Sequence, residues 1–371
     1  MHRIYCGADR LGTIDDELRG ARLALLTNAS GVDREGVPTY ERLARDYNLA
    51  LLLSPEHGIR TNLQDGSWAD DARDPETGTR MLCMRSCGNE ALDAALAEID
   101  LVLYDIQDVG ARFYTYLYNL TELMRRCAAA GVSLVVLDRP NPISGAVMGP
   151  VLDESRFSSF VGEYAIPTRY GLTVGEFANY INAEYSLGCE VRVVRLEGWS
   201  RDLYVDETDG LWVNPSPNIP GVGTAVNYLG TCIFEATNIS EGRGTTRPFD
   251  MIGAPFVDSR RLYDELCSQP HDGVVYRRTC FTPQFNKHAG QCCEGVELHI
   301  TDRSTYDPIA AALRILRHMR RYPEYTQRDN GLCLRWGTDW ILGEADPEEY
   351  QRFSAVECGR FCERCRPYIM Y

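Results

Sequence analysis

Residues 101–108 read Leu-Val-Leu-Tyr-Asp-Ile-Gln-Asp, a short apolar run that ends in a cluster of polar side chains. The same change occurs at 51–58 (LLLSPEHG) and at 134–141 (LVVLDRPN). Short, continuously apolar runs are typical of strands buried on both faces of a parallel sheet. Such a sheet collects its ligands at the carboxyl ends of its strands. The three segments therefore predict an α/β fold in which polar groups from distant parts of the chain meet at one edge of the sheet.

Strands and helices are expected to alternate over the first 200 residues. Apolar runs predict strands at 22–27, 50–53, 101–104, 133–137 and 190–196, and helical patterns lie near 39–47, 90–98, 117–130 and 173–185. The last helix has a capping box, because Thr173 is followed three residues later by Glu176. This alternation predicts a Rossmann-like parallel sheet with helices on both faces.

A turn-rich stretch at 214–221 (NPSPNIPG) interrupts this pattern and is the best candidate for a domain boundary. Beyond it lie a polar loop at 237–249, a strand-like run at 295–301 and a helical pattern at 307–321. We therefore expect a sheet domain at residues 1–222 and a smaller α+β domain at 223–371, with a cleft between them.

Composition excludes several classes of protein. The chain has 38 Lys plus Arg against 53 Asp plus Glu, a net charge of −15, and no basic run that could neutralise a nucleic acid backbone. No stretch approaches the roughly 20 apolar residues of a membrane helix. The amino end lacks the apolar core of a signal peptide, so the sequence predicts a cytoplasmic protein, exported only if a leader was removed. The 14 scattered cysteines then favour reduced thiols.

Glu56 and His57 are the first candidates for chemistry, because they follow a predicted strand end between a proline and a glycine. A glutamate in a partly apolar crevice has a raised pKa and can act as a general acid near neutral pH. The alternative is a surface turn with two solvated side chains.

Two further segments carry groups that suit a sugar. Residues 105–116 (DIQDVGARFYTY) combine carboxylates and an amide, which bind hydroxyls, with rings that can stack on a pyranose. They could instead form a helix entry whose Asp residues complement the helix dipole while its Tyr residues fill the core. The loop at 237–249 carries a carboxylate, two arginines and two glycines, and either binds a ligand or forms a flexible hairpin.

Two other patterns do not predict a cofactor. Residues 221–226 (GVGTAV) begin like a dinucleotide fingerprint, but they lack its third glycine and follow a proline, not a strand. Cys358, Cys362 and Cys365 have a spacing that iron–sulfur enzymes use, yet at helical spacing the three share one face and can simply be buried. We predict neither a metal nor another cofactor.

Five motifs together resemble the NamZ-like exo-β-N-acetylmuramidase family of peptidoglycan glycosidases. They are SPEHG (54–58), DIQDVGARFYTY (105–116), DRPNP (138–142), PSPN (215–218) and SEGRGT (240–245) with RPF (247–249), and their order and spacing match over nearly the whole chain. The resemblance implies a Rossmann-like domain, a smaller second domain, and a cleft that removes β-linked N-acetylmuramic acid from the non-reducing end of peptidoglycan fragments. Glu56 matches the glutamate proposed as catalytic in that family.

The predicted site follows from these motifs. Glu56 is the expected general acid, with His57 and Asp105 as further catalytic groups. Eleven side chains are expected to bind substrate: Gln107, Asp108, Arg112, Tyr114, Asn141, Glu163, Arg169, Asn218, Asn238, Glu241 and Arg243. The second catalytic group stays open among Asp105, Asp108, Glu163 and Glu241, and with it the choice between retention and inversion.

The expected substrates are peptidoglycan-derived disaccharides or muropeptides. N-acetylmuramic acid carries a lactyl carboxylate that N-acetylglucosamine lacks, and an arginine fork suits a carboxylate. Arg112, Arg169 and Arg243 are the candidates for that contact. The alternative function is a non-catalytic carbohydrate- or muropeptide-binding protein. A nucleotide-dependent enzyme is disfavoured by the missing fingerprint.

Overall fold

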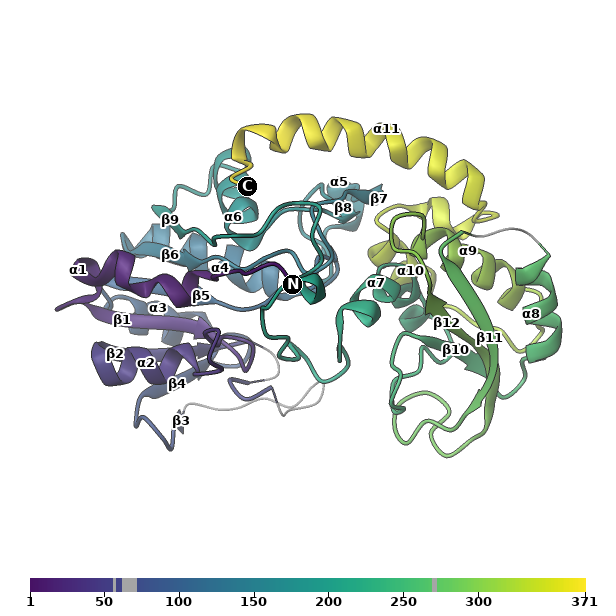
Figure 1. The fold of residues 1–371 in the computed structure, drawn as a ribbon, viewed down its shortest axis with the longest axis horizontal. Helices are drawn as coiled ribbons and strands as arrows, with labels where there is room; N and C mark the ends of the chain where they lie inside the picture. Colours follow the sequence, from purple (N-terminus) through teal and green to yellow (C-terminus); the bar gives the residue numbers. More distant parts are fainter. Residues whose placement is uncertain (56–57, 62–71, 269–271) are drawn as a thin grey trace.

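The computed structural model describes residues 1–55, 58–61, 72–268 and 272–371. Its largest sheet has the strand order β3-β4-β2-β1-β5-β6-β9, and every neighbouring pair is parallel except β3 with β4 (Figure 1). The strands are β1 (Arg22–Thr27), β2 (Asn48–Ser54), β3 (Ala72–Arg73), β4 (Arg80–Cys83), β5 (Leu101–Asp105), β6 (Ser133–Leu137) and β9 (Val191–Val194). The chain leaves β1 toward β2 and later returns to β5 on the other side, so the topological switch point lies between β1 and β5.

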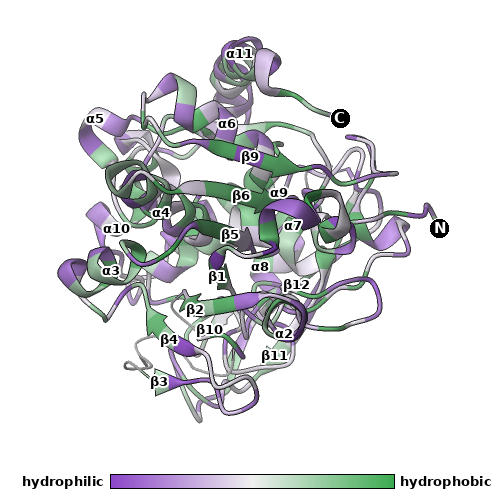
Figure 2. Ribbon diagram, turned by 90° about the vertical axis from the view of Figure 1, so that its left-hand side faces the viewer, coloured by the Kyte–Doolittle hydropathy of each residue, from purple (hydrophilic) through white to green (hydrophobic). Residues whose placement is uncertain are grey.

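Helices cover both faces of this sheet. Alternate residues of β1 point to opposite faces, so Ala24 and Leu26 belong to one buried cluster and Leu23 and Leu25 to another. The first cluster includes α3 (Asn89–Leu96), α4 (Tyr116–Ala130) and α6 (Val174–Glu184), and the second includes η1 (Gly7–Ile14), α1 (Asp15–Leu18) and α2 (Thr39–Asp46). Figure 2 shows the apolar strands in the middle of these layers. The predicted Rossmann-like sheet is confirmed.

Local details of the prediction also hold. The strands predicted at 22–27 and 133–137 have the observed bounds. Thr173 and Glu176 form the expected capping box, in which the Glu176 amide donates to Thr173 Oγ1 at 3.2 Å and the Thr173 amide donates to Glu176 Oε2 at 2.9 Å.

The second half of the chain forms the predicted smaller α+β unit. Its antiparallel sheet has the order β10-β12-β11, with β10 (Met251–Ala254), β11 (Val274–Phe281) and β12 (Cys293–Ile300). Its helices are α7 (Val222–Thr231), α8 (Ser259–Cys267), α9 (Pro308–Met319), α10 (Asp329–Trp336) and α11 (Pro347–Cys365). Short elements complete the chain: β7 (Met148–Val151), α5 (Glu154–Phe157), β8 (Pro167–Arg169), and the 3₁₀ helices η2 (Val205–Glu207), η3 (Cys232–Ala236), η4 (Asp339–Leu342) and η5 (Arg366–Tyr368). The division at 222/223 stays a prediction.

The C-terminal segment returns to the first half of the molecule. Helix α11 packs on α9 at one end and on β7 and β8 further along, and it crosses the top of the molecule in Figure 1. Beyond it, Tyr371 Oη donates to Asp138 Oδ2 at 2.7 Å, and the Met370 amide donates to Glu176 Oε1 at 2.8 Å. Asp138 and Glu176 are both fully buried in the sheet unit. The interval 223–371 is therefore not confined to one half of the molecule.

The two sequence patterns from which no cofactor was predicted both lie on helices. Residues 221–226 open helix α7 directly after the turn-rich segment. Cys358 and Cys365 are buried on α11, whereas Cys362 is exposed, so the expectation of one buried face is wrong for Cys362. Among the described residues no three His, Cys, Asp or Glu side chains are grouped to hold a metal ion. In the same part of the chain no helix has the length and apolar character needed to cross a membrane, and the cytoplasmic location stays a prediction.

Candidate active site

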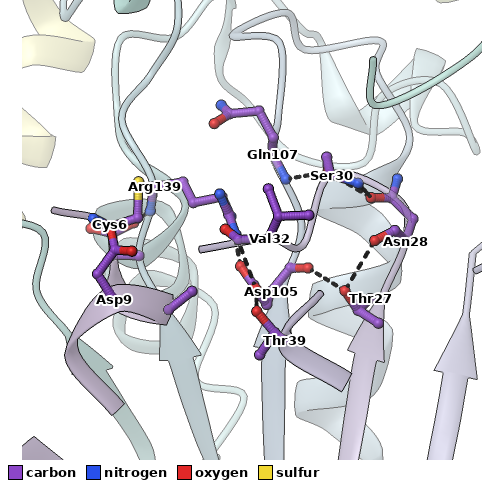
Figure 3. Close-up of polar contacts among 12 residues, drawn as sticks. Cys6, Asp9, Thr27, Asn28, Ser30, Val32, Thr39, Asp105, Gln107 and Arg139 are labelled. Carbon is purple, nitrogen blue, oxygen red and sulfur yellow. Dashed lines mark hydrogen bonds and ion pairs between the residues drawn. The ribbon is translucent and has the colours of Figure 1, made fainter. Parts of the chain in front are cut away.

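A buried ion pair fixes the strand ends at the switch point (Figure 3). Asp105, the last residue of β5, accepts from Arg139 Nε at 2.6 Å and from Arg139 Nη2 at 3.0 Å. The Thr39 hydroxyl donates to Asp105 Oδ2 at 2.6 Å, and Arg139 Nη2 also donates to the Val32 carbonyl at 2.7 Å. Asp105 is fully buried and both its oxygens are bonded. This carboxylate therefore joins the ends of β5 and β6 to the segment after β1.

The PSPN segment lies over the same strand ends. Asn28, just beyond β1, donates through Nδ2 to the Pro215 carbonyl at 2.9 Å, and Tyr116 Oη donates to that carbonyl at 2.8 Å. The backbone N–H of Gln107 donates to Ser30 Oγ at 2.9 Å, and this bond connects the segment after β5 to the segment after β1. Residues 215–218 are thereby held at the switch point, where ligands bind in sheets of this kind.

A cleft of about 730 Å³ opens beside this segment, and both halves of the chain line it. The first half contributes Phe113, Tyr114, Thr115, Phe160, Val161, Ser216, Asn218 and Ile219. The second half contributes Tyr228, Glu235, Glu241, Arg243, Phe249, Phe285, Asn286, Lys287, Arg328 and Arg335. Its volume lies within the roughly 300–1,000 Å³ of small-molecule sites.

Of the six charged side chains in the second-domain wall, five form a series of alternating sign: Arg335, Glu235, Arg243, Glu241 and Lys287. Arg335 Nη2 lies 2.6 Å from Glu235 Oε2, and Arg243 Nη2 lies 2.5 Å from Glu235 Oε1. Lys287 Nζ lies 2.8 Å from Glu241 Oε2, and Arg243 Nε lies 3.8 Å from Glu241 Oε1. Burial opposes the ionisation of Glu235, but the charges of Arg243 and Arg335 outweigh burial and lower its pKa. The wall thus presents carboxylates held between cations.

Aromatic rings line the cleft beside these charges. Tyr228 packs edge-on against Phe113 at 4.9 Å and against Phe249 at 4.6 Å between ring centroids. Tyr114 packs edge-on against Tyr116 at 4.8 Å. Aromatic faces beside charged hydrogen-bonding groups suit a sugar, which has apolar ring faces and polar edges.

Two glycines let the SEGRGT loop take its path along the cleft. Gly242 and Gly244 have φ of +79° and +82°, in the region that favours glycine. A Cβ on Gly244 would lie 2.5 Å from the Phe285 carbonyl oxygen, and one on Gly242 would lie 2.7 Å from that of Arg247. Glycine at 244 therefore allows the loop to pack against Gln284 and Phe285, and glycine at 242 allows the loop to fold back on Arg247.

The cleft brings together four of the predicted residues: Tyr114, Asn218, Glu241 and Arg243. Glu56 and His57 lie outside the described residues. The other predicted side chains, Asp105, Gln107, Asp108, Arg112, Asn141, Glu163, Arg169 and Asn238, are not among those that line the cleft.

Most of the residues away from the cleft bond within the protein. Glu163 pairs with Arg125 on α4 and accepts from Thr121 Oγ1. Asn141 Nδ2 donates to the Leu172 carbonyl, and Gln107 Nε2 donates to the carbonyls of Asp108 and Pro140. Arg169 donates to the carbonyl of Ile143 and to Ser144 Oγ, and Asn238 bonds the main chain at Glu324 and Thr326.

Arg112 caps a helix of the other half. It is fully buried, and its Nη2 donates to the carbonyls of Arg335 and Trp336 at 3.1 and 2.8 Å. Those carbonyls end α10, where a cation is favourable because helix C-termini carry partial negative charge. Burial lowers the pKa of Arg112 to about 10. Its polar contacts serve the junction between the two halves of the chain.

Several of these side chains still have a buried polar atom without a hydrogen bond in the described part of the chain: Asp108 Oδ1, Arg112 Nε and Nη1, and Arg169 Nε. Asp108 is the one carboxylate among them. Its Oδ2 accepts from the Gly110 amide at 2.6 Å and from the Tyr170 hydroxyl, whereas Oδ1 is buried without a hydrogen bond. Burial raises the pKa of Asp108 to about 7, against the opposing effect of these two hydrogen bonds. The site favours a protonated carboxyl.

Replacing Asp108 by Asn is expected to change how stability depends on pH. Between about pH 4 and 7 folded Asp108 holds a proton that the unfolded chain has lost, so its contribution to the free energy of unfolding falls as pH rises. Asn is neutral throughout, so relative to wild type the variant should gain up to about 1.4 kcal/mol per pH unit in this window. Urea unfolding at pH 5 and pH 8 measures this. The exposed control Asp264→Asn should follow wild type, and a pH-independent difference for Asp108→Asn contradicts the prediction.

Three charged residues of this cleft, Glu235, Lys287 and Arg335, were not predicted from the sequence. Glu235 lies two residues before the start of the polar loop, which was a usable signal. Lys287 is the only lysine in the 371 residues, which was a stronger one. Arg335 had no signal, because it lies 86 residues beyond the end of the loop at Phe249 and reaches the cleft only through the packing of α10.

The fold and the cleft together define a two-domain α/β enzyme whose crevice lies at the carboxyl edge of a parallel sheet and is walled by a second domain. Two models of the exo-β-N-acetylmuramidase NamZ family match the chain, the N-terminal model at residues 23–223 and the C-terminal model at 226–371. The chain belongs to this family, and the resemblance predicted from the five motifs is confirmed.

Relatives agree with this assignment. The peptidoglycan β-N-acetylmuramidase NamZ of Bacillus subtilis (strain 168) is 39% identical over 312 residues, which cover 83% of this chain and 75% of that protein. Two crystal structures of DUF1343 family proteins from Bacteroides fragilis NCTC 9343 share the fold. The structure at 1.65 Å resolution has a TM-score of 0.90 and 29% identity over 100% of both chains, and the one at 1.30 Å has 0.78 and 28% over 99% of both.

Proposed function

We propose that this enzyme removes β-linked N-acetylmuramic acid from the non-reducing end of peptidoglycan fragments, with disaccharides or muropeptides as its substrates. The observation that carries the proposal is the cleft, in which residues of three family motifs meet aromatic rings and a wall of alternating charges. The Bacillus relative is named a peptidoglycan β-N-acetylmuramidase. The proposed hydrolysis calls for no cofactor.

Glu56 is the proposed general acid, which protonates the oxygen of the leaving sugar. It follows β2 by two residues, and β2 pairs in parallel with β1. Beyond β1, Asn28 bonds the Pro215 carbonyl, and the next residue, Ser216, lines the cleft. Because the ends of parallel neighbours lie at one edge of the sheet, the position of Glu56 in the sequence supports this role. His57 is proposed to orient Glu56 or to contact the sugar.

Glu241 is the proposed second carboxylate, which faces the positive charge that develops on the reacting sugar. Of the four carboxylates that the sequence left open, it is the one in the cleft. Lys287 holds its Oε2, and its Oε1 lies 3.8 Å from Arg243, beyond hydrogen-bond distance. In Glu235, by contrast, each oxygen contacts an arginine. Asp105 is reassigned to holding the strand ends, because Arg139 and Thr39 occupy both its oxygens.

Arg243 is the proposed partner of the lactyl carboxylate. It is the one of the three predicted arginines in the cleft, whereas Arg112 and Arg169 are buried on main-chain carbonyls. Tyr114 and Asn218 are proposed to contact the sugar from the opposite wall.

The test is the identity of the product. Incubation with a disaccharide that has β-linked N-acetylmuramic acid at its non-reducing end should release free N-acetylmuramic acid, detected by mass spectrometry. A disaccharide with N-acetylglucosamine at that end should remain intact. Binding without any release would instead support the carbohydrate-binding alternative.

A further inference from the structure

The chain uses lysine at one position. Lys287 is its only lysine, and every other residue of its 38 Lys plus Arg is an arginine. The two side chains are not interchangeable, because an ammonium carries three donors on one nitrogen, whereas the donors of a guanidinium lie in a planar fork. A single lysine in an arginine-rich chain points to a position where the geometry of the ammonium matters.

Three acceptors converge on the Lys287 ammonium. Nζ donates to the carbonyl of Phe234 at 2.6 Å, to the carbonyl of Ile239 at 3.0 Å and to Glu241 Oε2 at 2.8 Å. The three donors of the ammonium are thus used, and the side chain is 20% exposed. Burial lowers the pKa of Lys287 while the charge of Glu241 opposes this. The Lys287 ammonium therefore bonds η3, the start of the polar loop and the Glu241 carboxylate at the same time.

The loop that carries Lys287 is bonded a second time to the SEGRGT motif (240–245), which contains Glu241. The Gln284 amide donates to the Gly244 carbonyl at 2.8 Å, and Gly244 is the position where a side chain would collide with Phe285. Lys287 and Glu241 are thus parts of two loops joined at two points, which limits how far their charged groups can move apart.

We propose that Lys287 is a positioning residue, whose ammonium fixes the Glu241 carboxylate against the reacting sugar and which arginine cannot replace. This inference rests on the proposed role of Glu241. A charge that stabilises a transition state acts best when it is held in place beforehand. Because the three acceptors surround a single nitrogen, a planar guanidinium on a longer stem cannot meet all of them without moving Glu241.

Kinetics test this role. Lys287→Arg and Lys287→Met should each lower kcat about 10-fold on a chromogenic β-N-acetylmuraminide, with KM changed less than about threefold, since the lost interaction acts mainly in the transition state. In a Glu241→Gln background, Lys287→Met should cause no further loss, because the carboxylate that it positions is absent. Gln291→Met, an exposed change on the same loop, should leave activity unchanged.

A spectroscopic measurement tests the contact without any activity. Protein grown with ¹³C,¹⁵N-lysine has one labelled side chain, so its NMR signal needs no assignment. That signal should differ from free lysine, should move in Glu241→Gln, and should stay in place in Gln291→Met.

The outcomes separate this inference from the proposed function. Wild-type activity of Glu241→Gln would remove Glu241 from catalysis and the inference with it. Loss of activity in Glu241→Gln together with full activity of Lys287→Arg would overturn the inference alone. So would a lysine signal that does not respond to Glu241→Gln, or an equal further loss when Lys287→Met is added to Glu241→Gln.

Discussion

Replacing Glu56 by Gln is expected to leave the fold intact and to lower kcat by at least about 10²- to 10⁴-fold, the usual contribution of general acid catalysis. Gln has nearly the shape of Glu but no proton to deliver to the leaving sugar. Because departure of the leaving group needs that proton, the loss should be largest on an unactivated disaccharide and smaller on an aryl glycoside. Steady-state kinetics on both substrates measures it.

The exposed Glu90→Gln is the matched control for this substitution. It makes the same chemical change at the start of α3 and should keep wild-type turnover. Circular dichroism and thermal unfolding should show that Glu56→Gln is folded. Near wild-type turnover of Glu56→Gln on the unactivated disaccharide would remove Glu56 from the role of acid.

Replacing Arg243 by Gln is expected to narrow the preference for N-acetylmuramic acid over N-acetylglucosamine by about 10- to 150-fold, the range of one charge-assisted hydrogen bond. The wild-type enzyme should release a chromophore from the β-N-acetylmuraminide far faster than from the matching β-N-acetylglucosaminide. The variant should lose rate on the first substrate and little on the second, which has no carboxylate for Arg243 to bind. The ratio of the two kcat/KM values is the measurement.

Arg247 gives the matched control, since it lies in the same loop but lines a separate cavity, where it pairs with Asp250 and Glu297. Arg247→Gln should keep the wild-type ratio. An unchanged ratio in Arg243→Gln would assign the lactyl contact elsewhere. Equal rates of the unmodified enzyme on the two glycosides would contradict both the arginine assignment and the muramidase function.

The sequence predicted the centre of the fold better than its edges. Strands β1, β5 and β6 are apolar on both faces, so their composition reveals them without any tertiary information. Strand β3, at the edge of the sheet, consists of two exposed residues, and its neighbour β4 has four residues of which only Leu82 and Cys83 are buried, so neither is long enough to show such a pattern. Helix α11 was missed because it buries only a narrow stripe, with the charged side chains of a surface helix between the buried residues.

Residues of three of the five motifs line the candidate cleft, but the motifs did not distinguish the residues that line it from those that lie elsewhere. Arg112 and Tyr114 belong to one motif, yet Tyr114 lines the cleft and Arg112 caps α10. Lining the cleft and capping a helix can each require a particular residue type, and a sequence motif does not show which of the two roles a residue has. Only the packing between the two halves of the chain distinguishes the role of Arg112 from that of Tyr114. That packing depends on contacts between residues more than 200 positions apart in the sequence.

Helix α11 also determines how the two halves of the molecule can move. The chain passes from the first half to the second before α7 and returns along α11, so the backbone crosses between the halves at two separate places. A body attached at one point can rotate about any axis, whereas a body attached at two points rotates mainly about the line between them. Opening of the cleft is therefore expected to follow mainly a single hinge axis, which changes its width but keeps Tyr114 in one wall and Glu241 in the other.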